Sequence, residues 1–171
     1  MKKKFCMMAV LLALSVGCAL PVSAATVSYP ETVLSNSNSR EEVTYFEDGS
    51  YIVTTIVEEV TPISRAITKT VLKKTSTSYD SSNKARCALT VIGSFEVNTG
   101  VSVKCVGAKT EKTVYQNDWS VENVSTYPDN SSTSKASAIA SGRFVERKAG
   151  IAVQSIPVTV KVTCDKNGNA S

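Results

Sequence analysis

The stretch from Cys87 to Cys105 constrains the fold of this chain more than any other part of it. Apolar or small residues alternate with polar ones along both halves, and Asn98-Thr99-Gly100 separates the halves. A period of two with one polar side is typical of a half-buried β-strand, and a short loop ending in glycine suits a hairpin. The stretch therefore predicts two antiparallel strands at the centre of a β-rich domain.

The hairpin loop also predicts a register. If Val97 faces Val101, then Cys105 faces Gly93, and Cys87 lies six residues farther along the first strand. At about 3.3 Å per residue this separates the two cysteines by roughly 20 Å, whereas a disulfide needs Cα atoms within about 7 Å. We therefore expect no disulfide between Cys87 and Cys105.

Other segments extend the β pattern along the chain. Asp48-Gly49 separates two β-branched and aromatic runs, as in a hairpin, and the alternating run from Ile156 to Cys164 carries Pro157, which places it at a sheet edge. Residues 134–146 alternate alanine with serine and lack helix caps, so they favour a strand. Seven or eight strands predict an all-β fold, either an antiparallel, immunoglobulin-like β-sandwich or an open barrel.

Residues 1–24 have the pattern of a secretory signal peptide. Three lysines precede an uncharged apolar run, and Val22-Ser23-Ala24 supplies a small-residue cleavage site before Ala25. The run is too short and too sharply ended for a stable membrane span. The alternative is a lipid anchor on Cys18, although the leucine that a lipobox carries three positions earlier is missing.

Cleavage leaves 147 of the 171 residues, which is enough for one domain. We expect a flexible leader over residues 25–41, which are polar and aperiodic, and a single β-sandwich domain over residues 42–171. Three of the 19 basic residues leave with the signal peptide, so 16 remain against 15 acidic residues and the net charge falls from +4 to +1. This balance argues against nucleic-acid binding, which depends on neutralising phosphates.

Three cysteines remain after cleavage, and export permits a disulfide between two of them. Cys105 and Cys164 both occupy inward positions near strand edges that should be adjacent, so we prefer this pair and expect Cys87 to be a free, buried thiol. A bond between Cys87 and Cys164 is the second alternative, and a fully reduced chain is the third.

The residues that most catalytic and metal sites require are missing or poorly placed. The chain has no histidine, which excludes the usual serine and cysteine hydrolase triads and histidine-containing zinc sites, and three widely spaced cysteines are a poor metal set. No glycine-rich phosphate loop occurs, and we expect no cofactor. The adjacent pairs Glu41-Glu42 and Glu58-Glu59 would point to opposite faces of a strand. The sequence therefore favours a protein that is not an enzyme.

The candidate aromatic binding surface consists of Trp119 with Tyr115 and Tyr127, which together could stack on a sugar. The alternative places Trp119 in the core between two sheets. We favour the core position, because a buried tryptophan is common in β-sandwiches.

Several short motifs together resemble small exported proteins of Gram-positive anaerobic bacteria, a group with no assigned function. They include Val91-Ile92-Gly93-Ser94-Phe95, Asn117-Asp118-Trp119-Ser120-Val121 and Val162-Thr163-Cys164-Asp165, and their order extends over the chain after Glu42. The resemblance implies pairing of Cys105 with Cys164, marks Cys87 as a departure from the pattern, and implies no activity.

These observations predict a secreted protein, free or associated with the cell wall, that acts as a non-catalytic binding module for an extracellular protein or glycan. One alternative is a secreted hydrolase that uses carboxylates such as Glu96, Glu122 or Glu146. Another is a bacteriocin-like or immunity factor.

Fractionation of a Gram-positive host that expresses the full chain tests the export prediction. We expect protein in the culture medium with an intact mass that begins at Ala25, because cleavage follows Ala24. A lipid-modified mass that begins at Cys18, recovered with the membranes, would contradict this expectation.

Overall fold

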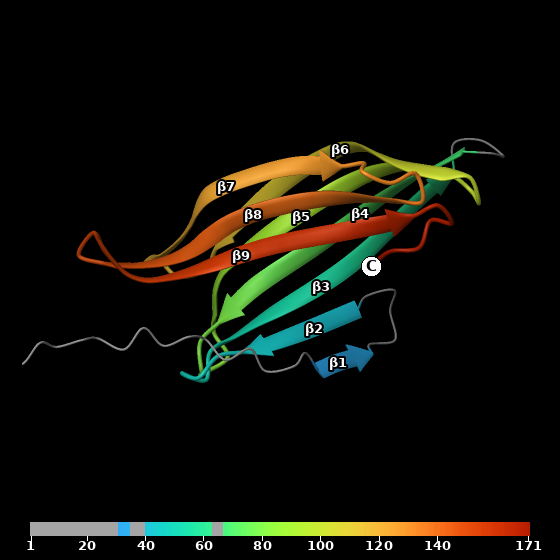
Figure 1. Cartoon of the computed structure of the whole chain (residues 1–171). Coiled ribbons are helices and arrows are strands. Elements are labelled where there is room, and N and C mark those ends of the chain that lie inside the picture. Colours follow the sequence, from blue (N-terminus) through green and yellow to red (C-terminus); the bar gives the residue numbers. More distant parts are fainter. Residues whose placement is uncertain (1–30, 35–39, 63–66) are drawn as a thin grey trace, which may run out of the picture.

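The computed structural model describes residues 31–34, 40–62 and 67–171, which form two antiparallel β-sheets (Figure 1). The first sheet has six strands in sequence order: β1 (Glu31–Leu34), β2 (Arg40–Tyr45), β3 (Tyr51–Pro62), β4 (Ile67–Tyr79), β5 (Ala85–Asn98) and β6 (Ser102–Val114). The second has three: β7 (Trp119–Asp129), β8 (Lys135–Lys148) and β9 (Ile151–Asp165). No helix occurs in the described ranges.

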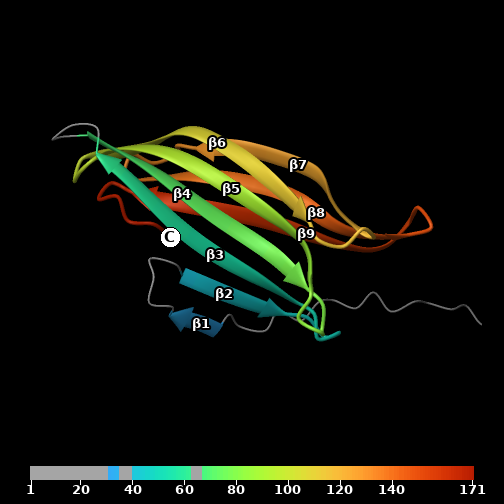
Figure 2. The ribbon, with the colours of Figure 1, turned by 180° about the vertical axis from the view of Figure 1, so that it is seen from behind.

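The two sheets lie face to face as layers of unequal width (Figures 1 and 2). Strands β7–β9 pack over β4, β5 and β6, whereas β1 and β2 extend beyond them. The sheets do not close on each other, so the predicted β-sandwich is confirmed and the alternative of an open barrel is not. Neighbouring strands are consecutive in the sequence, which makes each sheet a meander and not the Greek key of immunoglobulin domains.

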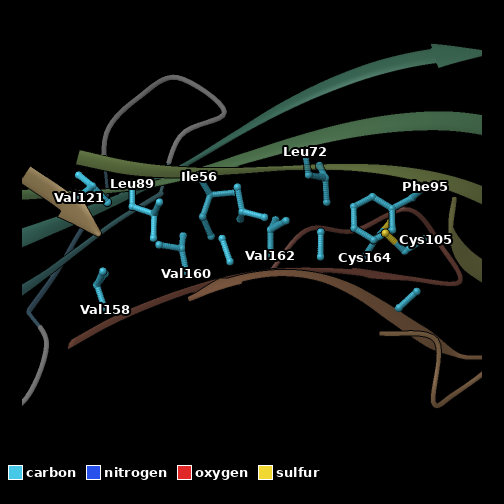
Figure 3. Packing of buried hydrophobic residues seen from close by; sticks show 14 of the residues in the cluster. Ile56, Leu72, Leu89, Phe95, Cys105, Val121, Val158, Val160, Val162 and Cys164 are labelled. Carbon is cyan, nitrogen blue, oxygen red and sulfur yellow. The ribbon is translucent and has the colours of Figure 1, made fainter. Parts of the chain in front are cut away.

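The core lies between the layers and consists mainly of aliphatic side chains from both sheets (Figure 3). Its largest fully buried apolar members are Phe95, Phe144, Leu72, Leu89, Val91, Val97, Val160 and Val162. Along β5 every odd residue from Cys87 to Val97 is buried, as the alternation in the sequence predicts. This face of β5 is therefore the centre of the first layer.

The predicted register of the β5–β6 hairpin is wrong by two residues at the loop. Val97 faces Val103, not Val101, and the turn residue Gly100 has a φ of 77°. Cys105 consequently faces Phe95, not Gly93, and the register then shifts past Val106, the residue that interrupts the alternation of β6. The bulge turns Val106 outward, where it is 44% exposed, and the inward positions of β6 change from odd residues such as Cys105 to even residues such as Ala108.

The expectation that residues 134–146 form a strand is confirmed by β8. Ala136, Ala138 and Ala140 are at most 1% exposed. A Cβ atom placed on Gly93 of β5 would lie 2.9 Å from the Cβ of Ala138. Small residues on both layers thus allow the sheets to approach closely at this point.

The amino-terminal boundary differs from the expected one. The strand β1 lies inside the segment predicted as a flexible leader, and β2 begins at Arg40, just before the expected domain start at Glu42. The described residues therefore contain nine strands, one more than the upper expectation. The predicted signal peptide, the cleavage site between Ala24 and Ala25 and the alternative anchor Cys18 lie outside the described residues.

The contact between Gly93 and Ala138 predicts a large difference between two glycine substitutions in one hairpin. Gly93→Ala should lower the free energy of unfolding by about 2 kcal/mol, because the new methyl group would overlap Ala138 and the ring of Phe95. Gly107→Ala in β6 is the matched control and should change it by less than about 0.5 kcal/mol, since the nearest atom is 3.8 Å away. Urea unfolding measures both, and equal midpoints would contradict the close packing.

Candidate functional site

The three cysteines of the described residues, Cys87, Cys105 and Cys164, are all buried and free in this structure. Cys105 of β6 and Cys164 of β9 come from opposite sheets, and their side chains meet beside Phe95 (Figure 3). Cys87 lies at the other end of the hairpin, where it faces Val114 of β6. The structure therefore brings together the two cysteines that the sequence favoured as a pair, and the bond between them stays a prediction.

Burial controls the chemistry of these thiols. It raises the pKa of Cys87 to about 12, and the positive charge of Arg86 acts in the opposite direction. It also raises the pKa of Cys164 to about 12, with further increases from the nearby Asp165, Glu58 and Cys105. Because a nucleophilic cysteine needs a lowered pKa, the structure gives Cys87 no feature of a catalytic thiol.

Trp119 does not contribute to an exposed aromatic surface. Its side chain is only 4% exposed and belongs to the core, where the guanidinium of Arg86 lies 4.7 Å from the ring centroid. Tyr115 and Tyr127 are 56% and 49% exposed. The indole ring therefore cannot join the two tyrosines in binding a sugar from solvent.

The structure shows a different aromatic row, which the sequence reasoning missed. Tyr45, Tyr51 and Tyr79 are direct cross-strand neighbours on β2, β3 and β4, with ring centroids 5.6 Å and 4.9 Å apart. The rings of Tyr51 and Tyr79 are nearly parallel, so each covers a face of the other. Such pairs stabilise a sheet by about 0.5–1.5 kcal/mol, but they leave little ring face for a sugar.

A groove of about 620 Å³ lies beside the edge strand β9. Its floor is the face of β2 and β3 that β7–β9 leave uncovered, with Thr44, Ile52 and Thr54, and the buried Ser76 of β4 lies beside it. One wall is the segment 154–159 of β9. The groove therefore exists because one sheet is wider than the other, and we call it the β9 groove.

Two carboxylates close one end of the β9 groove. Glu47 and Asp48 belong to the turn between β2 and β3, where Gly49 has a φ of 76°. The hydroxyl and the backbone N–H of Ser50 donate hydrogen bonds to Oδ1 of Asp48 at 2.5 and 3.0 Å. The hydrogen bond from the Ser50 hydroxyl is the main cause of the lowered pKa of Asp48. The Asp48 carboxylate therefore gives this end of the groove a negative charge at neutral pH.

The carboxylates proposed for a hydrolase do not line the β9 groove. Glu96 is exposed on β5 opposite Lys104. Glu122 on β7 accepts two hydrogen bonds from Arg147, at 2.9 and 3.0 Å, which lower its pKa, and Glu146 lies 3.1 Å from Lys148. Glycoside hydrolysis needs one carboxyl group with a raised pKa facing a second one across a cleft. The described residues provide no such pair among these three.

The described part of the chain provides neither a metal site nor a membrane-spanning helix. Histidine, cysteine and carboxylate side chains do not gather there in any group of three or more that could hold a metal ion. Nor does that part contain a helix with the length and hydrophobicity that a membrane crossing requires.

Comparison with known proteins assigns no family to the chain. No protein-family model matches it, and neither the curated proteins nor the solved structures contain a match. The candidate site therefore depends on the geometry of this molecule alone.

The meeting of Cys105 and Cys164 predicts which disulfide forms on oxidation. In a buffer of oxidised and reduced glutathione, the two thiols should form one disulfide bond. Their two protons and two electrons reduce one glutathione disulfide to two molecules of glutathione. Closing a loop of roughly 60 residues should stabilise the fold by about 4 kcal/mol. The rate should rise with pH, because the raised pKa of Cys164 leaves few thiolates at neutral pH.

Mass spectrometry after alkylation in denaturant checks this pairing. The wild type and Cys87→Ala should each contain one disulfide, whereas Cys105→Ala and Cys164→Ala should contain none. A disulfide that includes Cys87 would contradict the pairing.

Proposed function

We propose that this protein is a secreted, non-catalytic binding module that takes its ligand in the β9 groove. The observation that carries the proposal is the groove itself: an accessible cavity of about 620 Å³ between an open strand edge and an uncovered sheet face. Clefts of this size are the usual location of ligand sites. Export is predicted from residues 1–24, and the expected partners are an extracellular protein or a glycan at or near the cell wall.

The chemistry of the groove supports binding more than catalysis. The floor combines the hydroxyl groups of Thr44 and Thr54 with the apolar side chain of Ile52. The hydroxyl of Thr54 also forms a 2.8 Å hydrogen bond with the buried hydroxyl of Ser76. Glu47 and Asp48 are its ionisable groups, and the lowered pKa of Asp48 makes this residue a poor proton donor. Hydroxyl groups, an apolar surface and a fixed negative charge can bind and orient a ligand without taking part in a reaction.

The other two functions suggested by the sequence have less support. A hydrolase would need paired carboxylates with separated pKa values, whereas the structure holds Glu122 in an ion pair with Arg147. A bacteriocin-like or immunity role stays a prediction that growth-inhibition and protection assays can test.

Two substitutions in neighbouring residues of β3 test the β9 groove as the binding site. Thr54 lines the groove, whereas Thr55 points to the opposite face of the same sheet, and both side chains are half-buried. Thr54→Trp should fill the groove and weaken ligand binding at least about tenfold, which corresponds to roughly 1.4 kcal/mol. Thr55→Trp is the matched control and should leave binding unchanged.

Titration of the fluorescently labelled mature protein onto intact Gram-positive cells, and onto arrays of peptides and wall glycans, measures this effect. Saturable binding that survives Thr54→Trp, or that Thr55→Trp abolishes, would contradict the groove as the site. Turnover of a peptide or glycan by the wild type would contradict a non-catalytic role.

A further inference from the structure

The edge of β9 already accepts one short segment of its own chain. The backbone N–H of Thr163 donates to the carbonyl oxygen of Ser171 at 2.8 Å, and the N–H of Ser171 donates to the carbonyl oxygen of Thr163 at 2.9 Å. Cys164 and Ala170 form an antiparallel bridge beside them. The carboxy-terminal residues therefore form the first rung of a fourth strand on the three-stranded sheet.

None of the described strands pairs with the next rungs of this edge. In an antiparallel strand, alternate residues direct both backbone groups to the same side, so Lys161 and Thr159 point theirs outward as Thr163 does. Among the described strands β9 is the last of its sheet, and nothing pairs with it at these positions. Pro157 is the following outward position, and it lacks an N–H group.

The β9 groove lies where an added strand would run. The open edge at Thr159 and the neighbouring segment down to Gln154 form its wall, and the uncovered face of β2 and β3 forms its floor. A strand hydrogen-bonded to β9 would place every second side chain over this floor, toward Ile52 and Thr54. The remaining side chains would face solvent, as the exposed Thr159 and Lys161 do on β9.

We infer that the β9 groove binds an extended polypeptide segment of a partner protein, which pairs with the free edge of β9 as an additional strand. The inference deepens the proposed function and rests on it. Strand addition obtains affinity from backbone hydrogen bonds and specificity from alternate side chains. The partner segment has apolar residues at alternate positions and a basic residue at the end that meets Glu47 and Asp48.

The same features favour a partner protein over a second copy of this chain. In a twofold pairing of two β9 edges centred on Thr159, Lys161 of each copy would face Pro157 of the other, and each proline would leave a carbonyl oxygen without a donor. Proline and lysine on an edge strand are known to oppose pairing of identical edges. The two carboxylates of the groove instead attract a cationic segment.

The carboxy terminus provides a direct test, because it already lies in register with the edge. The pairs Thr163 with Ser171 and Cys164 with Ala170 both sum to 334, so about six residues added after Ser171 would run antiparallel along β9 to Pro157. An alternating Val-Thr extension would place its valines over the groove floor. The attachment supplies a high effective concentration, so no partner has to be known in advance.

Amide hydrogen exchange of the extended protein is the decisive measurement. We expect exchange at Lys161 and Thr159 to slow at least about tenfold relative to the chain that ends at Ser171. The matched control replaces the threonines of the extension by proline, which removes the donors that face β9. An extension that ends in lysine should slow exchange more than one that ends in glutamate, because Glu47 and Asp48 lie at that end of the groove.

Each other outcome overturns the inference. Unchanged exchange at Lys161 and Thr159 in a folded, extended protein would show that the edge does not accept a strand. If the amides of the protein without an extension are also protected, and this protection increases with protein concentration, the occupant is a second copy. A third outcome separates the two proposals. If Thr54→Trp abolishes binding of a ligand, but that ligand does not slow exchange at Lys161 and Thr159 of the wild type, the β9 groove remains the binding site and strand addition is wrong.

Discussion

The rest of the structure depends on the packing of β5 against β8 and β9. The buried face of β5 carries Leu89, Val91, Phe95 and Val97, which meet the alanines of β8 and the valines of β9. Burial of apolar surface at roughly 25 cal/mol per Å² is the main stabilising contribution that holds the two described sheets together. Gly93 and Ala138 allow the backbones to approach at the centre of this interface, so the layer spacing depends on side-chain size at these two positions.

The position of this contact determines where the candidate site lies. Three strands centred on β8 cannot cover six strands, so the face of β2 and part of β3 remain without a layer above them. The side chains on this uncovered face are more polar than the aliphatic side chains of β5, and they include Thr44 and Thr54. The β9 groove is thus a consequence of the layer arrangement, and the hydroxyl-rich floor makes its exposure to water energetically acceptable.

The local patterns of the sequence predicted the strands well, because alternation reports directly on the two faces of a strand. The strand assignment of β8 and the edge position of β9 followed from the small residues and from Pro157. The register of the β5–β6 hairpin could not be derived in the same way, since the bulge at Val106 depends on how β6 fits the opposite layer. Lys69, Lys73 and Lys74 are residues typical of an edge strand, whereas β4, which carries them, lies between β3 and β5.

The candidate site was harder to predict than the fold. Its wall and floor come from β9 and from β2–β4, which are more than 70 residues apart in the sequence and carry no motif. The row of Tyr45, Tyr51 and Tyr79 appears only when the strand register is known, because the three residues are adjacent across strands and not along one. By contrast, the proximity of Cys105 and Cys164 could be inferred, since both residues continue the inward phase of an alternating strand.

The meander order of both sheets has a consequence for how the molecule is made. Every strand pairs with the strand that precedes or follows it, so each hairpin can close as soon as its second strand has left the ribosome or an export channel. The contacts within each sheet are short in sequence, and only the meeting of the two layers must wait for β8 and β9. The six-stranded sheet would then expose its apolar face during synthesis until the last third of the chain covers it, which is the interval in which a chaperone would be most useful.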